Sequence, residues 1–242
     1  MLDQLTCPNC GATLLPPAPN SDVVTCQYCH TTFRIPSTST PQLDMGNLIL
    51  GADFRRQPIV GWGFPNPDNI HLSVDGTLPE LRAKFPAASS LYYVLNSSGY
   101  FDNLDVSVSI KFYEGDLDCI DAGMVLRYQK SVGSYSFLIS PLGTYSVAYY
   151  EKGDANGLKW NAIMNWSNNN ALLKGLNQVN RLRVIANGPH LKVYINGVIA
   201  TSIHDSRYEE GEVLLAAEGT VKSGVDVGFS NLQLREVTAN SN

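Results

Sequence analysis

The sequence LDVSVSIKFY, which runs from Leu104 to Tyr113, alternates apolar and polar side chains almost without exception. Successive side chains of a β-strand point to opposite sides, so this stretch predicts a strand with one apolar and one polar face. The apolar face carries Val106, Val108, Ile110 and Phe112. We expect that face in a hydrophobic core and the opposite face in contact with water.

Similar short runs recur along the chain, separated by turn signals. They cover residues 123–129, 134–140, 144–150, 181–186, 191–195, 198–203, 213–217 and 225–234. Asn196-Gly197 joins two of them and is a strong hairpin signal, because both residues tolerate the positive φ of a tight turn. No segment shows the periodicity of an ordinary helix, so we predict a mainly-β fold, either a sandwich or a barrel.

Composition and charge limit the classes of partner. The chain of 242 residues has a net charge of −5, and no cluster of Lys or Arg stands out in it. A phosphate backbone would therefore find little to neutralise, and we expect no nucleic-acid partner. The sequence has no visible signal peptide and no long apolar run, so we expect a cytoplasmic protein without a membrane span.

Four of the five cysteines form two Cys-x-x-Cys pairs, Cys7 with Cys10 and Cys26 with Cys29. Residues 11–25 lie between the pairs, a spacing typical of a four-thiolate zinc ribbon. Four thiolates complete a tetrahedron, which leaves no open position for catalysis and makes His30 a less suitable ligand. We predict a structural zinc ion in preference to iron, and so small a unit would depend on it to fold. The segment resembles the Cys-Pro-x-Cys-Gly ribbons of many bacterial and archaeal proteins.

The chain is expected to contain two domains joined by a Pro-, Ser- and Thr-rich connector. We predict a zinc ribbon over residues 1–35 and a linker over 36–43. A large β domain follows over 44–237, and a disordered tail over 238–242.

The large domain resembles the concanavalin A-like lectin and glucanase jelly rolls, in particular their laminin-G-like and glycosidase-associated bacterial branch. The resemblance spans roughly residues 100–236. It is carried by Val106–Ile110, Ala122–Tyr128, Ser134–Ile139, Asn180–Val184, Leu191–Gly197, Gly211–Val213 and Val227–Leu232. It implies a β-sandwich of the jelly-roll type.

An acidic run follows the strand predicted over Leu104–Tyr113. Catalytic glucanases of that superfamily carry acidic residues alternating along one strand, and Glu114-Gly115-Asp116-Leu117-Asp118 is the nearest match. Its last acid is Asp, and Gly115 indicates a turn, so we favour a solvated loop over a catalytic strand. A calcium site built from Glu114, Asp116, Asp118 and Asp121 is the alternative, since calcium sites occur in the laminin-G-like relatives.

The polar faces of consecutive strands predict a binding surface. Its members are Ser107, Ser109, Lys111, Arg127, Gln129, Ser136, Ser146 and Tyr150. Arg127 is flanked by core residues and should bind either a carboxylate of its own sheet or a ligand.

Aromatic residues offer a second candidate surface. Trp160 and Trp166 share one strand face with Ala162 and Met164 and would suit sugar stacking if exposed, but we expect them in the core. Trp62 lies in a glycine-flanked loop and is the better candidate for an exposed contact.

Taken together, these patterns favour a non-catalytic binding module, a zinc ribbon attached to a jelly roll that recognises glycan or protein. One alternative is a structural protein that assembles as a homo-oligomer through its sheets. The other is a glycoside hydrolase, which rests on the superfamily and on the imperfect acidic run.

Overall fold

The computed structural model describes residues 23–25, 27–29, 32–34, 46–52, 54–55, 59–73, 79–88, 90–152 and 158–237. The chain divides into two compact units, Met1–Leu43 and Asp44–Asn242. None of the described residues belongs to a helix long and apolar enough to cross a membrane.

In the first unit the described residues include a short antiparallel pair, β1 (Val23–Thr25) and β2 (Thr32–Arg34). Cys29 lies in the turn between these strands. Cys7, Cys10 and Cys26 lie outside the described residues, as do His30, the whole expected linker and the expected C-terminal tail. The zinc ribbon therefore stays a prediction.

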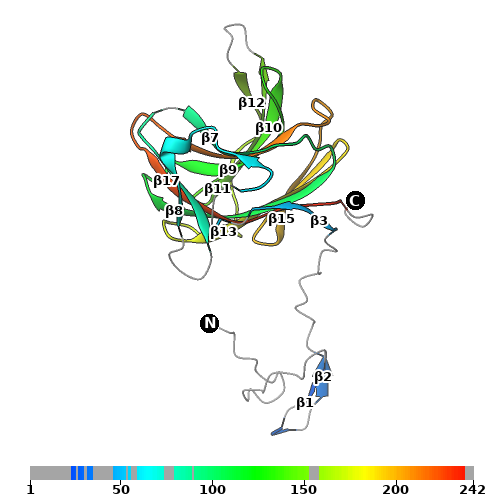
Figure 1. Cartoon of the computed structure of the whole chain (residues 1–242). Helices are drawn as coiled ribbons and strands as arrows, with labels where there is room; N and C mark the ends of the chain where they lie inside the picture. The colour runs from blue at the N-terminus through cyan, green and yellow to red at the C-terminus, as the bar shows by residue number, and fades with distance from the viewer. Residues whose placement is uncertain are drawn as a thin grey trace. The chain divides into compact units, whose positions relative to one another are not determined.

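The second unit is a sandwich of two antiparallel sheets (Figure 1). Its described residues contain no α-helix, as the strand patterns predict, and only one short 3₁₀ turn, Pro67–Asn69. In spatial order the seven-stranded sheet consists of β12 (Leu158–Asn168), β11 (Thr144–Lys152), β10 (Gly133–Ser140), β9 (Asp121–Gln129), β16 (Glu212–Gly219), β7 (Ser90–Ser97) and β4 (Trp62–Gly63).

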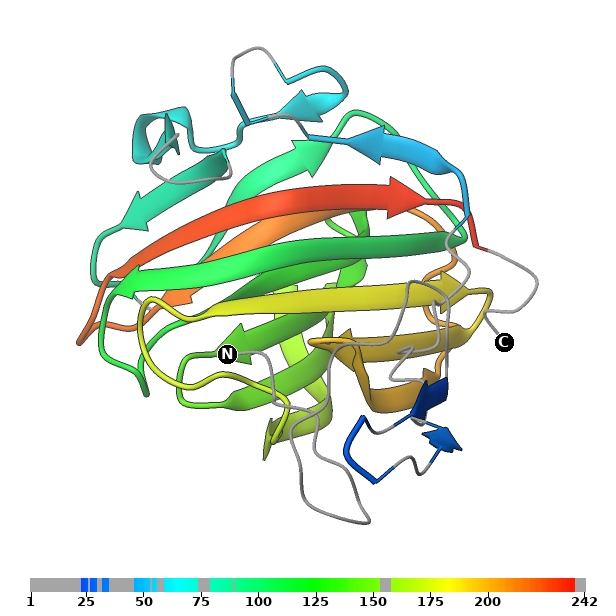
Figure 2. The same cartoon turned by 90° about the horizontal axis from the view of Figure 1, so that it is seen from below.

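The eight-stranded sheet contains the alternating sequence Leu104–Tyr113. In spatial order it consists of β15 (Val198–His204), β14 (His190–Ile195), β13 (Val179–Asn187), β8 (Leu104–Glu114), β17 (Val225–Arg235), β6 (Glu80–Phe85) and β5 (Ile70–Ser73), with β3 (Leu48–Gly51) paired to β17 as well. Figure 2 shows these strands from below, with β17 in red beside β8 in green. β17 thus has β8 along one side and both β6 and β3 along the other.

The core lies between the two sheets and confirms the alternation of β8. Val106, Val108 and Ile110 are completely buried, and Phe112 is 1% exposed. Inward side chains of the other sheet, such as Phe137 on β10, belong to the same cluster. The hairpin at Asn196-Gly197 also forms as predicted, with φ of 50° and 84° at its two turn residues.

The outer face of β8 differs from the expectation of a wet surface. Ser107 and Ser109 are buried, because long side chains of the neighbouring strand cover them. The Arg181 guanidinium donates a hydrogen bond to the Ser107 hydroxyl over 2.7 Å. Arg183, two residues farther along the same strand, forms an ion pair with Asp105. The alternation therefore predicted correctly that these serines point away from the core, and predicted wrongly that they are exposed to water.

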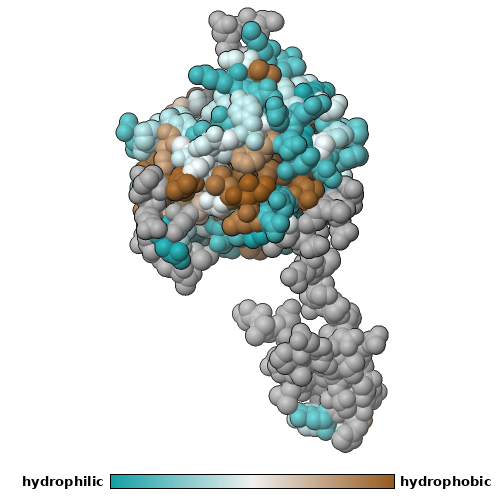
Figure 3. Space-filling model, turned by 45° about the vertical axis from the view of Figure 1, so that its right-hand side comes forward, coloured by the Kyte–Doolittle hydropathy of each residue, from teal (hydrophilic) through white to brown (hydrophobic). Residues whose placement is uncertain are grey.

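Apolar side chains nevertheless reach the surface of this unit, and Figure 3 shows one side on which they gather below a mostly hydrophilic part. Leu48 and Ile49 on β3 are about half exposed, as are Val198 and Ile199 on the edge strand β15. Val179 on β13 is a further exposed apolar residue of the eight-stranded sheet.

Candidate functional site: a groove on the seven-stranded sheet

The outer face of the seven-stranded sheet carries a groove of about 610 Å³. Core residues such as Met124, Phe137 and Val147 point inward from β9, β10 and β11, so the alternate residues of these strands point outward into the groove. The groove is lined by Ser90, Leu91, Asp118, Cys119, Ile120, Asp121, Leu138, Ser140, Leu142, Thr144, Ser146, Tyr150, Trp160, Trp166, Glu218 and Thr220.

One wall of the groove is aromatic. Trp160 on β12 lies directly opposite Tyr150 on β11 in the strand register. The side chains of Trp160 and Trp166 are each 42% exposed, so both indole rings remain available for contact. Such rings combine a large apolar surface with a hydrogen-bond donor, a combination suited to ligands with both apolar and polar faces.

The exposure of these two tryptophans corrects the expectation that they pack in the core. The pairing of β11 with β12 shifts register twice between Ala162 and Ser167, so β12 does not alternate regularly there. Met164 packs against the core, whereas Trp160 and Trp166 line the groove. A strict period of two placed all three on one face, and the bulges separate them.

The groove also contains a pair of facing carboxyl groups. Asp121 on β9 and Glu218 on β16 are directly opposite each other in register, and both line the groove. Burial raises the pKa of Asp121 well above its usual value, and the charge of Glu218 raises it further. Burial raises the pKa of Glu218 as well. The oxygen Asp121 Oδ1 is buried and accepts no hydrogen bond from the described residues.

Hydroxyl groups surround this acidic pair. Ser140, Thr144 and Ser146 line the groove on β10 and β11. Tyr150 contributes a phenol whose pKa is raised by burial and then by the charges of Glu218 and Asp121. The groove therefore offers acceptors and donors beside an aromatic wall, which is the usual composition of a small-molecule site.

Farther along the same sheet the outer face is closed by side chains. Val125, Leu214 and Ala216 form a separate apolar cluster, against which Tyr93 and Tyr128 pack. The two tyrosine rings meet edge to face with centroids 5.3 Å apart, and burial raises the pKa of Tyr93 to about 12. The groove is thus confined to one part of the outer face.

Of the residues predicted to form the binding surface, Tyr150 and Ser146 line the groove, and Ser136 is buried on the same sheet. Arg127 does not reach the groove. Its guanidinium is buried and donates hydrogen bonds to the backbone carbonyls of Tyr208, Asp102 and Gly188. These three carbonyls take the place of the expected carboxylate or ligand, and Nε of Arg127 has no hydrogen-bond partner among the described residues.

The remaining predicted contacts are separated from the groove. Ser107 and Lys111 belong to β8 in the other sheet, where the Lys111 ammonium lies 4.3 Å from the centroid of the Tyr113 ring. The Gln129 amide donates to the Glu210 carbonyl. Trp62 is 7% exposed, packs in the core and donates through Nε1 to the Gly51 carbonyl, so the expectation of an exposed contact is wrong.

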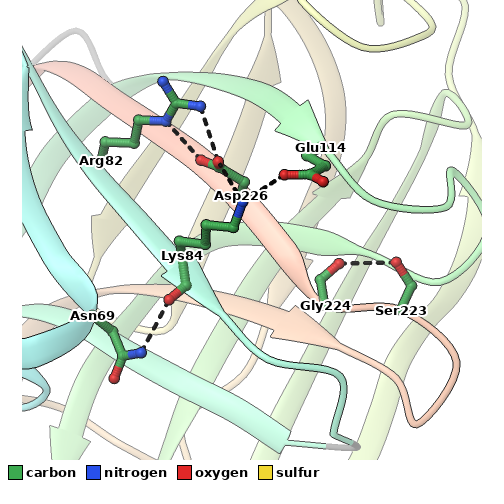
Figure 4. A network of polar contacts seen from close by, with 7 residues as sticks. All are labelled: Asn69, Arg82, Lys84, Glu114, Ser223, Gly224 and Asp226. Carbon is green, nitrogen blue, oxygen red and sulfur yellow. Dashed lines mark hydrogen bonds and ion pairs between the residues drawn. The ribbon is translucent and has the colours of Figure 1, made fainter.

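The structure does not bring the four acids of the suggested calcium site together. Glu114 forms an ion pair with Lys84 over 2.6 Å on the eight-stranded sheet, next to the pair between Arg82 and Asp226 (Figure 4). Asp118 and Asp121 instead line the groove. Within the described part of the chain, no group of three or more His, Cys, Asp or Glu side chains could hold a metal ion.

The sequence reasoning missed the pairing of Asp121 with Glu218. A signal was present, because Glu218 is the only charged residue inside the apolar run Val213–Gly219. A charge at an outward position of an otherwise apolar strand indicates a special environment. Its partner strand, however, could not be identified from pattern alone.

Comparison with known proteins supports the fold. No family model and no curated protein matches the chain. Among solved structures, it is similar to the carbohydrate-binding module CBM66 from Bacillus subtilis, with 16% identity and a TM-score of 0.53 over 73% of this chain and 96% of that one. A family 16 endo-glucanase from Bacteroides ovatus gives 11% identity and a TM-score of 0.59 over 77% and 100%.

The Bacillus licheniformis beta-glucanase gives 12% identity and a TM-score of 0.53 over 78% of this chain and 98% of that one. At these identities the likeness concerns architecture. The large unit is therefore a mainly-β jelly roll of the concanavalin A-like fold.

Proposed function

We propose that the large unit binds carbohydrate in the groove of its seven-stranded sheet, without cleaving it. The observation that carries this proposal is the exposed pair Trp160 and Trp166 on the groove wall, together with the facing carboxyl groups in the same groove. A sugar ring has apolar faces formed by its C–H groups and an equator of hydroxyl groups. The indole rings suit the faces, and the carboxyl and hydroxyl groups suit the equator.

The structural comparisons support a carbohydrate ligand, since the similar structures include a carbohydrate-binding module and glucanases. They do not distinguish binding from cleavage, so the arrangement of acids has to be considered separately. On the central strand β9 the outward positions after Asp121 are Gly123 and Val125. This strand therefore lacks the succession of alternating acids that the glucanase resemblance would require, which favours binding over hydrolysis.

In the experiment the full chain is titrated with a panel of soluble oligosaccharides, and the affinity for each is measured by calorimetry. Replacing Trp160 or Trp166 with alanine is expected to weaken binding of the best ligand about five- to thirtyfold, because an aromatic contact with the ligand contributes on the order of 1 to 2 kcal/mol. Tyr100→Ala is the matched control, since Tyr100 is 56% exposed and does not line the groove.

Equal binding by the tryptophan variants and the control would refute the groove as the site. Release of reducing ends from any bound oligosaccharide would refute the non-catalytic part of the proposal. Both measurements use the same purified chain and the same ligands.

A further inference from the structure

The charges that line the groove all have one sign. Asp118, Asp121 and Glu218 are present, whereas no Lys, Arg or His side chain appears among the described lining residues. The chain as a whole also carries a net charge of −5. A ligand with carboxylate or sulfate groups would meet repulsion without any compensating cation, so the groove disfavours acidic sugars.

Asp121 and Glu218 are more than a general acidic surface. Residues directly opposite each other on antiparallel strands hold their Cβ atoms about 5 Å apart, so the two carboxyl groups face the same small volume. No hydrogen bond joins them among the described contacts, and Asp121 Oδ1 has no donor at all. Buried acceptors are almost always satisfied in native proteins, and an exception indicates a missing partner.

We propose that the groove selects oligosaccharides that carry protonated amines, with an ammonium group bound between Asp121 and Glu218 and other rings of the same oligosaccharide against Trp160 and Trp166, because β10 and β11 separate the two acids from the tryptophans. This inference rests on the proposed carbohydrate-binding function and narrows its ligand class. An ammonium group has three donors and one positive charge, so it can serve both carboxylates at once. The ring contact and the ionic contact lie in the same groove, because all four residues line it.

A divalent cation fits these residues less well. Calcium takes six to eight oxygen ligands, and the described residues supply only this pair of carboxylates without a third acid in a common cluster. A neutral sugar could donate hydroxyl groups to the same oxygens, but it would leave the repulsion between the two acids in place. An ammonium group removes that repulsion.

The raised pKa values of Asp121 and Glu218 give the proposal a second test, which is the pH dependence of binding. The titratable groups that interact with Asp121 are Glu218 on β16 and Tyr150 on β11; Tyr93 on β7 interacts with Tyr150, and Asp118 also lines the groove. Both carboxyl groups bind protons more tightly than usual, because they are buried. Amine binding should therefore strengthen as the pH rises and the acids ionise, and weaken again when the amine itself loses its proton.

The experiment compares four oligosaccharides of equal length on the full chain. They are a glucosamine oligomer, its N-acetylated counterpart, a neutral glucose oligomer and an oligogalacturonate. We expect the glucosamine oligomer to bind at least about tenfold more tightly than the acetylated and neutral ones near pH 6.5, and the oligogalacturonate to bind most weakly. The preference should shrink at high salt.

The variants Asp121→Asn and Glu218→Gln are expected to abolish this preference, while binding of the neutral oligomer persists. Asp68→Asn is the charge-matched control, because Asp68 is exposed and lies outside the groove. If Asp121→Asn does not fold, Glu218→Gln and the pH profile of the unmodified chain give the same answer.

Equal affinity for the amino and neutral oligomers, or a preference that survives both amide variants, would overturn this inference and leave the carbohydrate-binding proposal intact. Competition of the amine by micromolar calcium would overturn it as well. If none of the four oligomers binds and none binds in the wider panel, both proposals fail.

Discussion

Replacing Arg127 with alanine should destabilise the jelly roll without affecting the groove. The side chain is 3% exposed, and its guanidinium donates to carbonyls at residues 102, 188 and 208 over 3.0, 2.8 and 2.7 Å. Hydrogen bonds that involve a charged group contribute about 1.5 to 3 kcal/mol each. Burial lowers the pKa of Arg127, which means that desolvation of the charge offsets part of this gain.

The lower end of that range gives about 4.5 kcal/mol for the three bonds together, and after the desolvation cost is subtracted we expect a loss of about 3 to 4 kcal/mol in the free energy of unfolding. Arg127→Lys should lose about 2 kcal/mol or more, because a single ammonium cannot match the geometry of the guanidinium fork. Gln129→Ala serves as the control, since it removes one exposed bond and should cost less than about 1 kcal/mol.

The assay is urea denaturation of the full chain, monitored by tryptophan fluorescence, with oligosaccharide binding measured on the same samples. A loss below about 1 kcal/mol in Arg127→Ala would refute the assignment of Arg127 as a clamp between loops. If Arg127→Ala lost ligand binding and kept its stability, Arg127 would be a ligand contact, which the hydrogen bonds of its guanidinium contradict.

Three further predictions concern other parts of the chain. Metal analysis should find one zinc ion per chain, and Cys7→Ser together with Cys10→Ser should remove it; a chain purified without zinc or iron would contradict the ribbon. Asp121→Asn should raise the melting temperature at neutral pH. The pKa of Asp121 in the folded state lies above its usual value of 3.8, so the folded protein loses stability as the pH rises from 3.8 through the raised pKa, and asparagine avoids this loss because it does not ionise. The gain should vanish below about pH 4, and a gain of equal size at every pH would argue against this account. Glu114→Gln should change stability by less than about 1 kcal/mol and leave ligand binding unchanged, because its ion pair with Lys84 is exposed, and a marked loss of binding would return the acidic run to consideration.

Alternation along the chain predicted most of the strands after residue 103 and their inward faces, whereas it did not locate β3 to β7. Val106, Val108 and Ile110 lie in the core because a period of two leaves an antiparallel strand few alternatives. The same pattern contains no information on which sheet a strand joins. Ser107 and Tyr150 were therefore grouped on one surface, although β8 and β11 belong to different sheets.

The groove was predicted only in part, because its form depends on irregular features. The register shifts of β12 separate Trp160 and Trp166 from Met164, whereas a regular pattern would have placed all three on one face. The facing of Asp121 and Glu218 depends on the pairing of β9 with β16, strands that are far apart in the sequence. Local sequence reasoning cannot supply a contact of that range.

The position of β17 has a consequence for synthesis. β8 acquires one of its two neighbours only when residues 225–235 are available, long after β8 itself has left the ribosome. Until then an apolar strand carries an open row of amide and carbonyl groups, which is a template for pairing with other chains. Because so many contacts join distant segments, the sandwich should fold slowly and all at once. A nascent chain of this protein is thus most exposed to aggregation just before its last strand emerges, and this is the stage at which a chaperone would have the greatest effect.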